Sequence, residues 1–404
     1  MTTVDDLARS PNALAPHYSH FRVADRLLLT GHSHQAWPDV AREPQLQAYD
    51  DAAELVDDKW DRAFARADDV RAGFRRLLCD PGSDIALGAS THDVVVRFLS
   101  ALDLSGARRR LVTSTGEFHT LRRQLARLAE AGIDVEWVAA EPAATLAERL
   151  AGVVDARTAA VLVSAVLFET ARVVPDLDSL ATACRSIGAE LLVDAYHALG
   201  VVPFPIHGLG LTDAWVVGGG YKYLQLGEGN CFLRMPAHAG RLRPVVTGWY
   251  ADFDTLPEQP RPDPVAYGRG AQRFAGATYD PTSHYRAARV FGFFEEHGLT
   301  AELLHRSYRH QLEVLTREFD ALGVPEEVMT RDRATPLSSF GGFLALRTPN
   351  ASGVQADLRD RGVSADSRGR FLRLGPAPYL SDSQLEAAVG TLGEVLRDAR
   401  RPRR

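Results

Sequence analysis

The chain has 404 residues, of which 45% are hydrophobic and 24% are charged, a composition typical of ordinary globular proteins. Its formal net charge is −6 at pH 7, and its basic runs, at 108–110 and 400–404, are short, which argues against nucleic acid as a partner. The three cysteines, Cys79, Cys184 and Cys231, form no C-x-x-C pair, so we expect neither a disulfide framework nor a zinc site and predict no metal.

The N-terminal residues and the longest apolar run indicate the cellular location of the protein. Residues 1–6 are acidic and lack the basic region and apolar stretch of a secretory signal peptide. The longest apolar run, at about 159–168, is half of the ~20 residues that a membrane-spanning helix needs. We therefore expect a cytoplasmic protein without a membrane partner.

Apolar runs alternate with helical patterns through the middle of the chain. Continuous β-branched and leucine runs separated by helices are typical of a mostly parallel sheet that is buried on both faces. In such α/β folds, ligands bind beyond the carboxyl ends of the strands. The candidate strands are 85–89, 111–114, 135–139, 160–165, 190–194, 215–218 and 231–235, and the candidate helices are 93–104, 120–131, 145–153 and 179–187.

A proline-rich segment at 255–264 interrupts this alternation, and a different pattern follows it. The elements predicted there are helices at 283–297 and 302–322, strands at 341–347 and 369–374, and a final helix at 381–397. This order indicates a smaller α+β domain. We therefore predict a large domain at 51–281, a small C-terminal domain at 282–404, and an N-terminal segment at 1–50 that packs with the small domain.

Two residues that follow predicted strands carry reactive groups. Asp194 ends the apolar run 191–194, and Lys222 comes 28 residues later, after the glycine-rich turn 218–220. The cofactor pyridoxal phosphate (PLP) needs both groups, because an amine forms a Schiff base with its aldehyde and a carboxylate keeps its pyridine nitrogen protonated. Taken singly, Lys222 also fits a surface lysine and Asp194 a strand-end cap. Taken together, they predict a PLP site.

The order of several short motifs resembles the aminotransferase class V group of PLP enzymes and, within that group, the kynureninases. The resemblance covers about residues 30–380 and is most specific at 190–250. The motifs are Asp-x-x-His at 194–197, Tyr-Lys-Tyr-Leu at 221–224, Gly-Glu-Gly at 227–229, Gly-Trp at 248–249 and Phe-x-Gly-x-Thr at 274–278. The resemblance implies an α/β, three-layer PLP-dependent transferase-like fold (fold type I) with a mostly parallel seven-stranded sheet and a smaller α+β domain.

The resemblance also implies roles for the residues around Lys222. Lys222 would be the Schiff-base lysine, and Asp194 would pair with the pyridine nitrogen of the cofactor. His197 would lie near the oxygen on the cofactor ring. Tyr221 would touch the phosphate and serve as a proton donor.

Further residues match family positions that hold the cofactor. Ser90 and Thr91 would form a phosphate cup at the start of a helix, where backbone amides and the helix dipole bind anions. Phe118 would stack on the cofactor ring. Trp249 and Thr278 would reach the phosphate site of a neighbouring subunit, so the resemblance implies a homodimer with active sites at the subunit interface.

The resemblance implies an amino-acid substrate whose α-carboxylate is held by Arg373, since a planar guanidinium suits a bidentate contact. His32 and Ser33, in the loop 31–35, match a segment that lines the substrate pocket. Here the loop reads Gly-His-Ser-His-Gln where kynureninases have Gly-Asn-Ser-Leu-Gly, and residues 118–121 read Phe-His-Thr-Leu in place of Phe-Pro-Ser-Asp. The implied reaction is hydrolysis of the Cβ–Cγ bond of L-kynurenine or a related amino acid, giving L-alanine and an aryl acid.

Three other interpretations stay open. An aminotransferase or β-lyase of class V would use the same residues on a different amino acid, whereas a desulfurase is disfavoured because no cysteine follows Cys231. A non-catalytic protein that binds PLP or an amino acid is disfavoured by the intact pair of Asp194 and Lys222. A metal hydrolase that uses His32, His34 and Asp194 is disfavoured, because two histidines without clear carboxylate partners are too few ligands.

Overall fold

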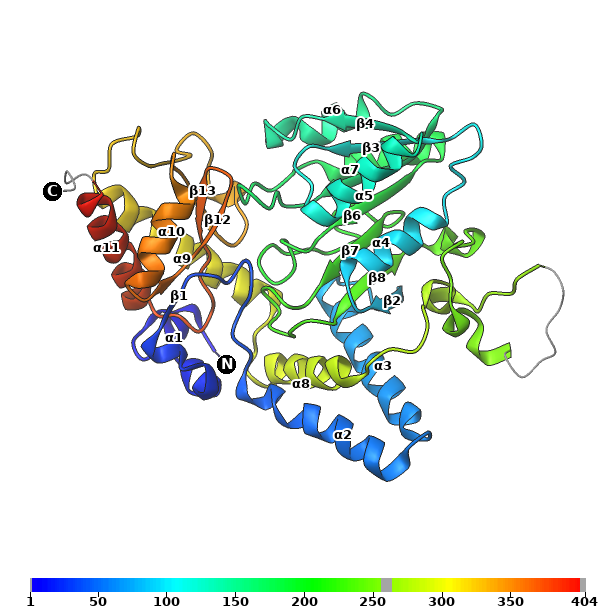
Figure 1. Cartoon of the computed structure of the whole chain (residues 1–404), viewed down its shortest axis with the longest axis horizontal. Helices are drawn as coiled ribbons and strands as arrows, with labels where there is room; N and C mark the ends of the chain where they lie inside the picture. Colours follow the sequence, from blue (N-terminus) through cyan, green and yellow to red (C-terminus); the bar gives the residue numbers. More distant parts are fainter. Residues whose placement is uncertain (1, 256–263, 400–404) are drawn as a thin grey trace.

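The centre of the protein is a seven-stranded sheet, seen in a computed structural model that describes residues 2–255 and 264–399 (Figure 1). The strand order is β2-β8-β7-β6-β5-β3-β4, and β8 is antiparallel to both of its neighbours while the other pairs are parallel. The predicted mostly parallel, seven-stranded sheet is confirmed. Its strands are β2 (Asp84–Gly88), β3 (Arg110–Ser114), β4 (Asp134–Val138), β5 (Thr158–Ser164), β6 (Glu190–Asp194), β7 (Trp215–Gly219) and β8 (Cys231–Met235).

Helices cover both faces of this sheet. All residues of β5 are buried, and its side chains alternate between two hydrophobic clusters: Val161 and Val163 belong to one, Ala160 and Leu162 to the other. Two-sided burial explains why the strands read as continuous apolar runs in the sequence. One face is covered by α6 (Leu146–Ala151) and α7 (Leu177–Ile187), and the other by α4 (Thr91–Ser100) and α5 (His119–Glu130).

Three further helices pack together in the lower part of Figure 1: α2 (Glu43–Leu55), α3 (Lys59–Leu77) and α8 (Thr282–Glu296). The sequence analysis assigned no element to α2 or α3. Phe74 of α3 packs against Phe232 of β8, with ring centroids 4.3 Å apart, and against Phe291 of α8 at 5.4 Å. Gly73 permits this approach, because a Cβ atom there would lie 2.3 Å from the Phe291 ring.

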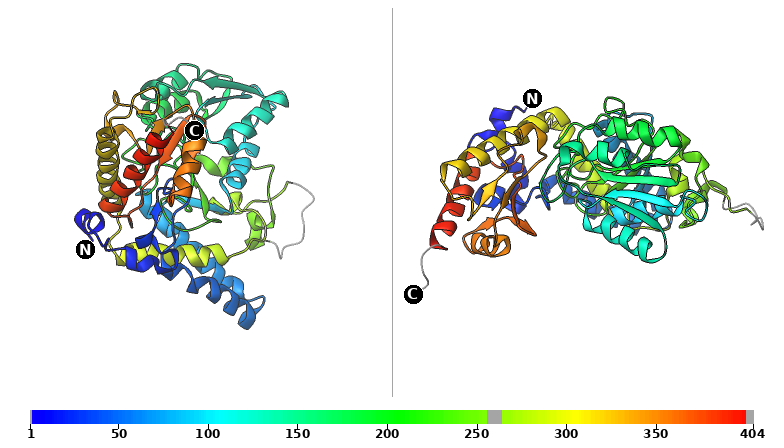
Figure 2. Two further views of the ribbon diagram at one scale, coloured as in Figure 1. Left: turned by 60° about the vertical axis from the view of Figure 1, so that its left-hand side comes forward. Right: turned by 90° about the horizontal axis from the view of Figure 1, so that it is seen from above.

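The C-terminal residues form a second sheet, of order β12-β13-β10-β9, beside the larger one (Figure 2). Its strands are β9 (Thr330–Arg331), β10 (Leu344–Arg347), β12 (Asp366–Arg368) and β13 (Phe371–Leu374). Its helices are α9 (Ala301–Ala321), α10 (Ala351–Asp360) and α11 (Asp382–Asp398), of which α9 and α10 contact the sheet and α11 packs against both.

The start of the chain packs against this C-terminal part. Strand β1 (Leu27–Leu28) pairs in parallel with β11 (Val363–Ser364), and α1 (Val4–Ala8) contacts α9. The division at residues 50 and 281 stays a prediction: α2 spans the first of these bounds and α8 begins just after the second.

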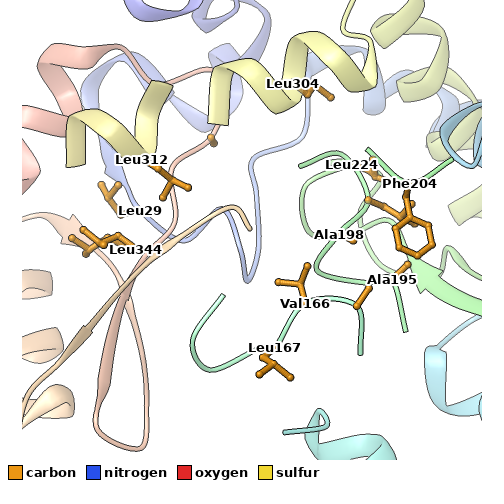
Figure 3. Close-up of a cluster of buried hydrophobic side chains, with 14 of the residues drawn as sticks. Leu29, Val166, Leu167, Ala195, Ala198, Phe204, Leu224, Leu304, Leu312 and Leu344 are labelled. Atoms are coloured by element: carbon orange, nitrogen blue, oxygen red, sulfur yellow. The ribbon is translucent and has the colours of Figure 1, made fainter. Parts of the chain in front are cut away.

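A hydrophobic core continues from the strand ends of the large sheet into the C-terminal part (Figure 3). The residues labelled there come from the N-terminal segment, from loops after β5, β6 and β7, and from α9 and β10. They are Leu29, Val166, Leu167, Ala195, Ala198, Phe204, Leu224, Leu304, Leu312 and Leu344. The loops beyond the strand ends are therefore packed on both sides, which fixes the position of the polar residues they carry.

No helix within residues 2–255 and 264–399 is long and apolar enough to cross a bilayer. In the same two ranges, no three His, Cys, Asp or Glu residues are grouped as ligands of a metal ion would be. The proline-rich segment noted in the sequence lies for the most part outside the described residues.

Candidate active site

A cavity of about 250 Å³ lies beyond the carboxyl ends of β5, β6 and β7. Of the nine residues that the sequence analysis expected around the cofactor, seven line this cavity together. They are Ser90, Thr91, Phe118, Asp194, His197, Tyr221 and Lys222. Because β6 and β7 are parallel neighbours, their carboxyl ends meet at one edge of the sheet, and this brings Asp194 and the turn before Lys222 to the same place.

The glycine-rich turn after β7 lets the chain pass close to its neighbours. A Cβ atom at Gly219 would lie 2.5 Å from the hydroxyl of Tyr196 and 2.7 Å from the sulfur of Cys231. A Cβ atom at Gly220 would lie 2.4 Å from the Leu226 side chain. The turn therefore has to be glycine-rich, and it delivers Lys222 into the cavity.

The amine of Lys222 is poised as a nucleophile. The side chain is buried, and its Nζ atom lies 2.8 Å from Nε2 of His197. Burial lowers the pKa of Lys222 to about 7, because the attraction of Asp194 compensates only in part and Arg373 repels the charge. Burial and the nearby Lys222 also lower the pKa of His197. A substantial fraction of the amine is thus uncharged near neutral pH, as nucleophilic attack requires.

Asp194 lies across the cavity at the end of β6. It accepts a hydrogen bond of 2.8 Å from the backbone N–H of Tyr196. Burial raises the pKa of Asp194, and this hydrogen bond and the charge of Lys222 oppose that effect. A carboxylate in such a place favours a ligand that brings a positively charged N–H group.

The N-terminus of α4 faces the same cavity. Ser90 caps this helix: its hydroxyl accepts from the backbone N–H of Asp93 at 3.2 Å, and Asp93 accepts from the backbone N–H of Ser90 at 3.1 Å. Ala89, Ser90 and Thr91 all line the cavity. The free N–H groups and the dipole of a helix N-terminus favour a phosphate or a carboxylate.

Aromatic rings surround the amine. The Nζ atom of Lys222 lies 4.5 Å from the ring centroid of Tyr196, 5.2 Å from that of Phe118 and 5.7 Å from that of Tyr221. The Tyr221 ring is stacked on His34 with centroids 5.0 Å apart. Burial raises the pKa of Tyr221 to about 12, which keeps its phenol protonated. The cavity is therefore suited to a flat, ring-shaped ligand with an anionic end.

Two of the predicted cofactor residues, Trp249 and Thr278, do not line this cavity. The indole Nε1 of Trp249 donates a hydrogen bond of 3.2 Å to the hydroxyl of Thr278, and the Trp249 side chain is 45% exposed. The structure thus brings these two residues to each other but leaves them away from Lys222 within one chain.

The predicted substrate residues also lie outside the cavity lining. His32 is buried against Phe343, with ring centroids 4.6 Å apart, and burial lowers its pKa to about 4. The hydroxyl of Ser33 lies 3.2 Å from Nδ1 of His34. Arg373 is buried behind Phe168, whose backbone carbonyl accepts a hydrogen bond from it.

The sequence analysis did not assign several residues that build or support the site. Tyr196 and Cys231 are among those that line the cavity, and Glu117, which precedes Phe118 in the chain, is buried. Glu117 accepts hydrogen bonds from the hydroxyls of Ser114 at 2.5 Å and Ser164 at 2.6 Å. Its place was a readable signal, because Glu117 follows the end of β3 by three residues and Asp194 ends β6 at the same edge of the sheet. A second signal was lysine scarcity, since the chain has two lysines, Lys59 and Lys222.

Glu117 makes the stability of the fold depend on pH. Burial raises its pKa from 4.5 to about 7, against the two serine hydrogen bonds, and nearby Asp194 adds to the rise. A carboxyl with a raised pKa contributes its full stability below about pH 4.5 and loses it as the pH rises through about 7. When the pH rises from 5 to 8, the free energy of unfolding of the wild type should therefore fall more than that of Glu117→Gln. The difference between the two decreases should be at most about 3 kcal/mol. Urea denaturation at both pH values measures this, and parallel losses in the two proteins would show that Glu117 ionises freely.

Comparisons with known proteins show which sequences and folds this chain is similar to. No family model matches the chain. Kynureninase from Pseudomonas fluorescens is 27% identical over 426 aligned positions, which cover 98% of this chain and 96% of that protein. Kynureninase from Burkholderia mallei (strain SAVP1) is 29% identical over 254 positions, which cover 60% of this chain and 57% of that protein.

Solved structures with the same fold include two that cover nearly all of the chain. A cysteine desulfurase from Thermococcus onnurineus NA1 has a TM-score of 0.78 at 16% identity, covering 96% of this chain and 99% of its own. A C-DES variant with glycine covalently linked to its PLP cofactor has a TM-score of 0.80 at 16% identity, covering 94% of this chain and 98% of its own. At this identity the likeness shows the fold alone, and it confirms the fold class expected from the sequence.

Proposed function

Since this chain is a homologue of kynureninases with the fold of class V PLP enzymes, we propose that it is a PLP-dependent hydrolase. Its proposed reaction cleaves the Cβ–Cγ bond of L-kynurenine or a related amino acid and releases L-alanine and an aryl acid. The observation that carries this proposal is the buried amine of Lys222, 2.8 Å from His197, in a cavity that it shares with Asp194.

The residues of the cavity fit PLP by their chemistry. The lysine amine suits the cofactor aldehyde, and the carboxylate of Asp194 suits a protonated pyridine nitrogen. The N-terminus of α4, with Ser90 and Thr91, suits a phosphate. Phe118 offers a flat apolar face for the ring. When bound, PLP supplies an electron sink for the negative charge that forms at the Cα atom of an amino acid.

The remaining chemistry belongs to the side chains of this chain. Lys222 would remove the proton from Cα, and a pKa of about 7 matches what a general base needs near neutral pH. His197, at 2.8 Å, would hold the lysine amine in line with that proton. Asp194 would keep a positive charge on the nitrogen it faces. Tyr221, whose pKa is raised to about 12 by burial, would donate a proton to the carbon that leaves as L-alanine.

The test of the proposed reaction is a panel of amino acids offered to the purified protein with PLP, with products identified by mass spectrometry. L-alanine and anthranilate from L-kynurenine would support the hydrolase. Turnover that requires a keto acid, or that releases pyruvate, would instead identify the aminotransferase or β-lyase that remains the second candidate. Failure to turn over any amino acid would contradict the proposed function.

Arg373 is the proposed ligand of the substrate α-carboxylate. Arg373→Lys keeps the charge but loses the fork of parallel donors. We expect kcat/KM to fall by one to two orders of magnitude, because a lost ionic hydrogen bond costs ~1.5–3 kcal/mol. Cofactor absorbance should stay unchanged, since Lys222, Asp194 and the α4 N-terminus are untouched. An unchanged kcat/KM would mean that another group binds the carboxylate, and lost PLP would mean that Arg373 supports the fold.

The protein is proposed to act as a homodimer in which Trp249 and Thr278 complete the phosphate site of the partner. Four exposed apolar side chains lie close together in the sequence, and the Trp249 and Phe253 rings are in contact; the four are Val245 (83% exposed), Val246 (47%), Trp249 (45%) and Phe253 (37%). Exposed apolar patches of this kind mark interaction surfaces. Sedimentation should give twice the mass of the chain, and a fully active monomer would contradict these two assignments.

A further inference from the structure

Asp366 joins two arginines beside the candidate active site. Strands β12 and β13 form an antiparallel pair whose register places Asp366 directly opposite Arg373. One carboxylate oxygen, Oδ2, pairs with the Nη2 atom of Arg373, and the other, Oδ1, lies 3.1 Å from Nη1 of Arg368. The strand register, rather than a flexible loop, therefore sets this contact.

Of the two contacts that Asp366 makes with arginines, the one with Arg373 is buried. Arg373 is 3% exposed and Asp366 is 8% exposed, whereas Arg368 is partly exposed. The Arg373 guanidinium carbon lies 5.4 Å from the ring centroid of Phe343, which forms a floor beneath it. A buried guanidinium that lost its carboxylate would keep an uncompensated charge, so Asp366 must strongly restrict where Arg373 sits.

The Arg373 guanidinium still has capacity for a ligand. Its Nη1 group donates to the backbone carbonyl of Phe168, and its Nη2 group meets Asp366. Its buried Nε atom has no hydrogen-bond partner among the residues that the structure describes. A buried donor left unpaired is costly, and a carboxylate oxygen of a ligand would satisfy it.

This group is close to the reacting amine. Phe168, which binds Arg373 through its carbonyl, is itself a wall of the cavity that contains Lys222. The charge of Arg373 also contributes to the lowered pKa of Lys222. The arginine is thus held against a residue of the cavity wall by one amino group, while its other amino group pairs with Asp366.

We propose that Asp366 is a positioning residue: it orients Arg373 so that the unpaired N–H edge of the guanidinium meets the α-carboxylate of an amino acid. This inference rests on the proposed function, and it adds a residue to which the sequence analysis assigned no role. Asp366 does not itself touch the substrate. Asp366 also lies 3.1 Å from Nη1 of Arg368 and 3.6 Å from Nε2 of His32, and the inference assigns its effect on the substrate to its contact with Arg373.

The test uses the holoenzyme and L-alanine, the proposed product, whose binding is followed by the change in cofactor absorbance. Asp366→Asn should raise the Kd for L-alanine, and the KM for L-kynurenine, at least about tenfold, with kcat changed less than about threefold and PLP content unchanged. Asp332→Asn is the matched control. It removes a carboxylate that forms a different ion pair, with Arg172 at 2.9 Å. It should leave the Kd, the KM, kcat and the PLP content unchanged.

A double-mutant cycle separates positioning from a general structural effect. If Asp366 acts only through Arg373, adding Asp366→Asn to Arg373→Lys should raise the Kd for L-alanine by less than about twofold. An equal loss in both backgrounds, or an Asp366→Asn variant that binds as tightly as the wild type, would overturn the inference. Tighter binding would mean that Asp366 competes with the ligand for Arg373.

Two further outcomes have a defined meaning. If Asp366→Asn does not fold, Asp366→Glu takes its place, because the extra methylene must move the guanidinium, and an unchanged Kd would then overturn the inference. A wild-type protein that neither binds L-alanine nor turns over L-kynurenine refutes the proposed function and this inference with it. A wild type that does both, with unaltered Asp366 variants, refutes the inference alone.

Discussion

Replacing Lys222 by alanine should lower kcat about 10⁴-fold or more. The variant loses the amine that would link to the cofactor and the base that would remove the Cα proton, and the proton transfer alone is worth ~10²–10⁴-fold. The loss should not come from unfolding, because the lysine stem lies in a cavity rather than in the packed core. Steady-state kinetics on the substrate found in the amino-acid panel measure the change.

Lys59→Ala is the matched control for this variant. Lys59 is the other lysine of the chain, and it lies on α3 with its amine 5.8 Å from the Trp60 ring. We expect normal kcat and KM for it. Residual activity of Lys222→Ala within tenfold of the wild type would mean that another group serves as the base.

Replacing Asp194 by asparagine should lower kcat about 10²–10³-fold. The amide keeps the shape of the side chain but cannot hold a positive charge on the nitrogen that it faces. Breaking one side of a buried charged pair costs about 3–5 kcal/mol, and the lower part of this range, about 3–4 kcal/mol, corresponds to two to three orders of magnitude in rate. Kinetics and the cofactor absorbance spectrum together report the change, because the spectrum responds to the charge of the cofactor ring.

The partly exposed Asp213, which pairs with Arg185 at 3.1 Å just before β7, offers a control at the opposite end of the same sheet. Asp213→Asn should leave the rate and the spectrum unaltered. If Asp194→Asn were equally active, the carboxylate would be a strand-end cap, and a different residue would have to face the cofactor nitrogen.

The central sheet was predictable because strands that are buried on both faces appear in the sequence as continuous apolar runs. Strand β5 is buried along its whole length, and the predicted strand 160–165 overlaps all but its first two residues. Helix α3 was missed for a physical reason: its buried stripe begins with Ala63 and Ala67, which carry too little apolar surface to stand out between charged residues. Only Val70 and Phe74 extend that stripe with larger side chains.

Some residues of the candidate site were likewise predictable from the sequence, and others were not. Asp194 and Lys222 were predictable together because each follows an apolar run, and parallel neighbouring strands bring their ends to one edge. Cys231 was not, because it begins β8, the antiparallel strand, whose N-terminal end reaches the same edge. The contact of Asp366 with Arg373 depends on the register of β12 and β13, which no local pattern in the sequence fixes.

The most direct test of the central claim is to find which amine holds the cofactor. The protein purified with PLP is treated with borohydride, digested and mapped by mass spectrometry. Lys59 and Lys222 are the two lysines of the chain, so the result is easily read. We predict one pyridoxyl group per chain, on the peptide that contains Lys222. Modification of Lys59 instead, or no stable modification of a protein saturated with PLP, would contradict the assignment of Lys222 and with it the proposed function.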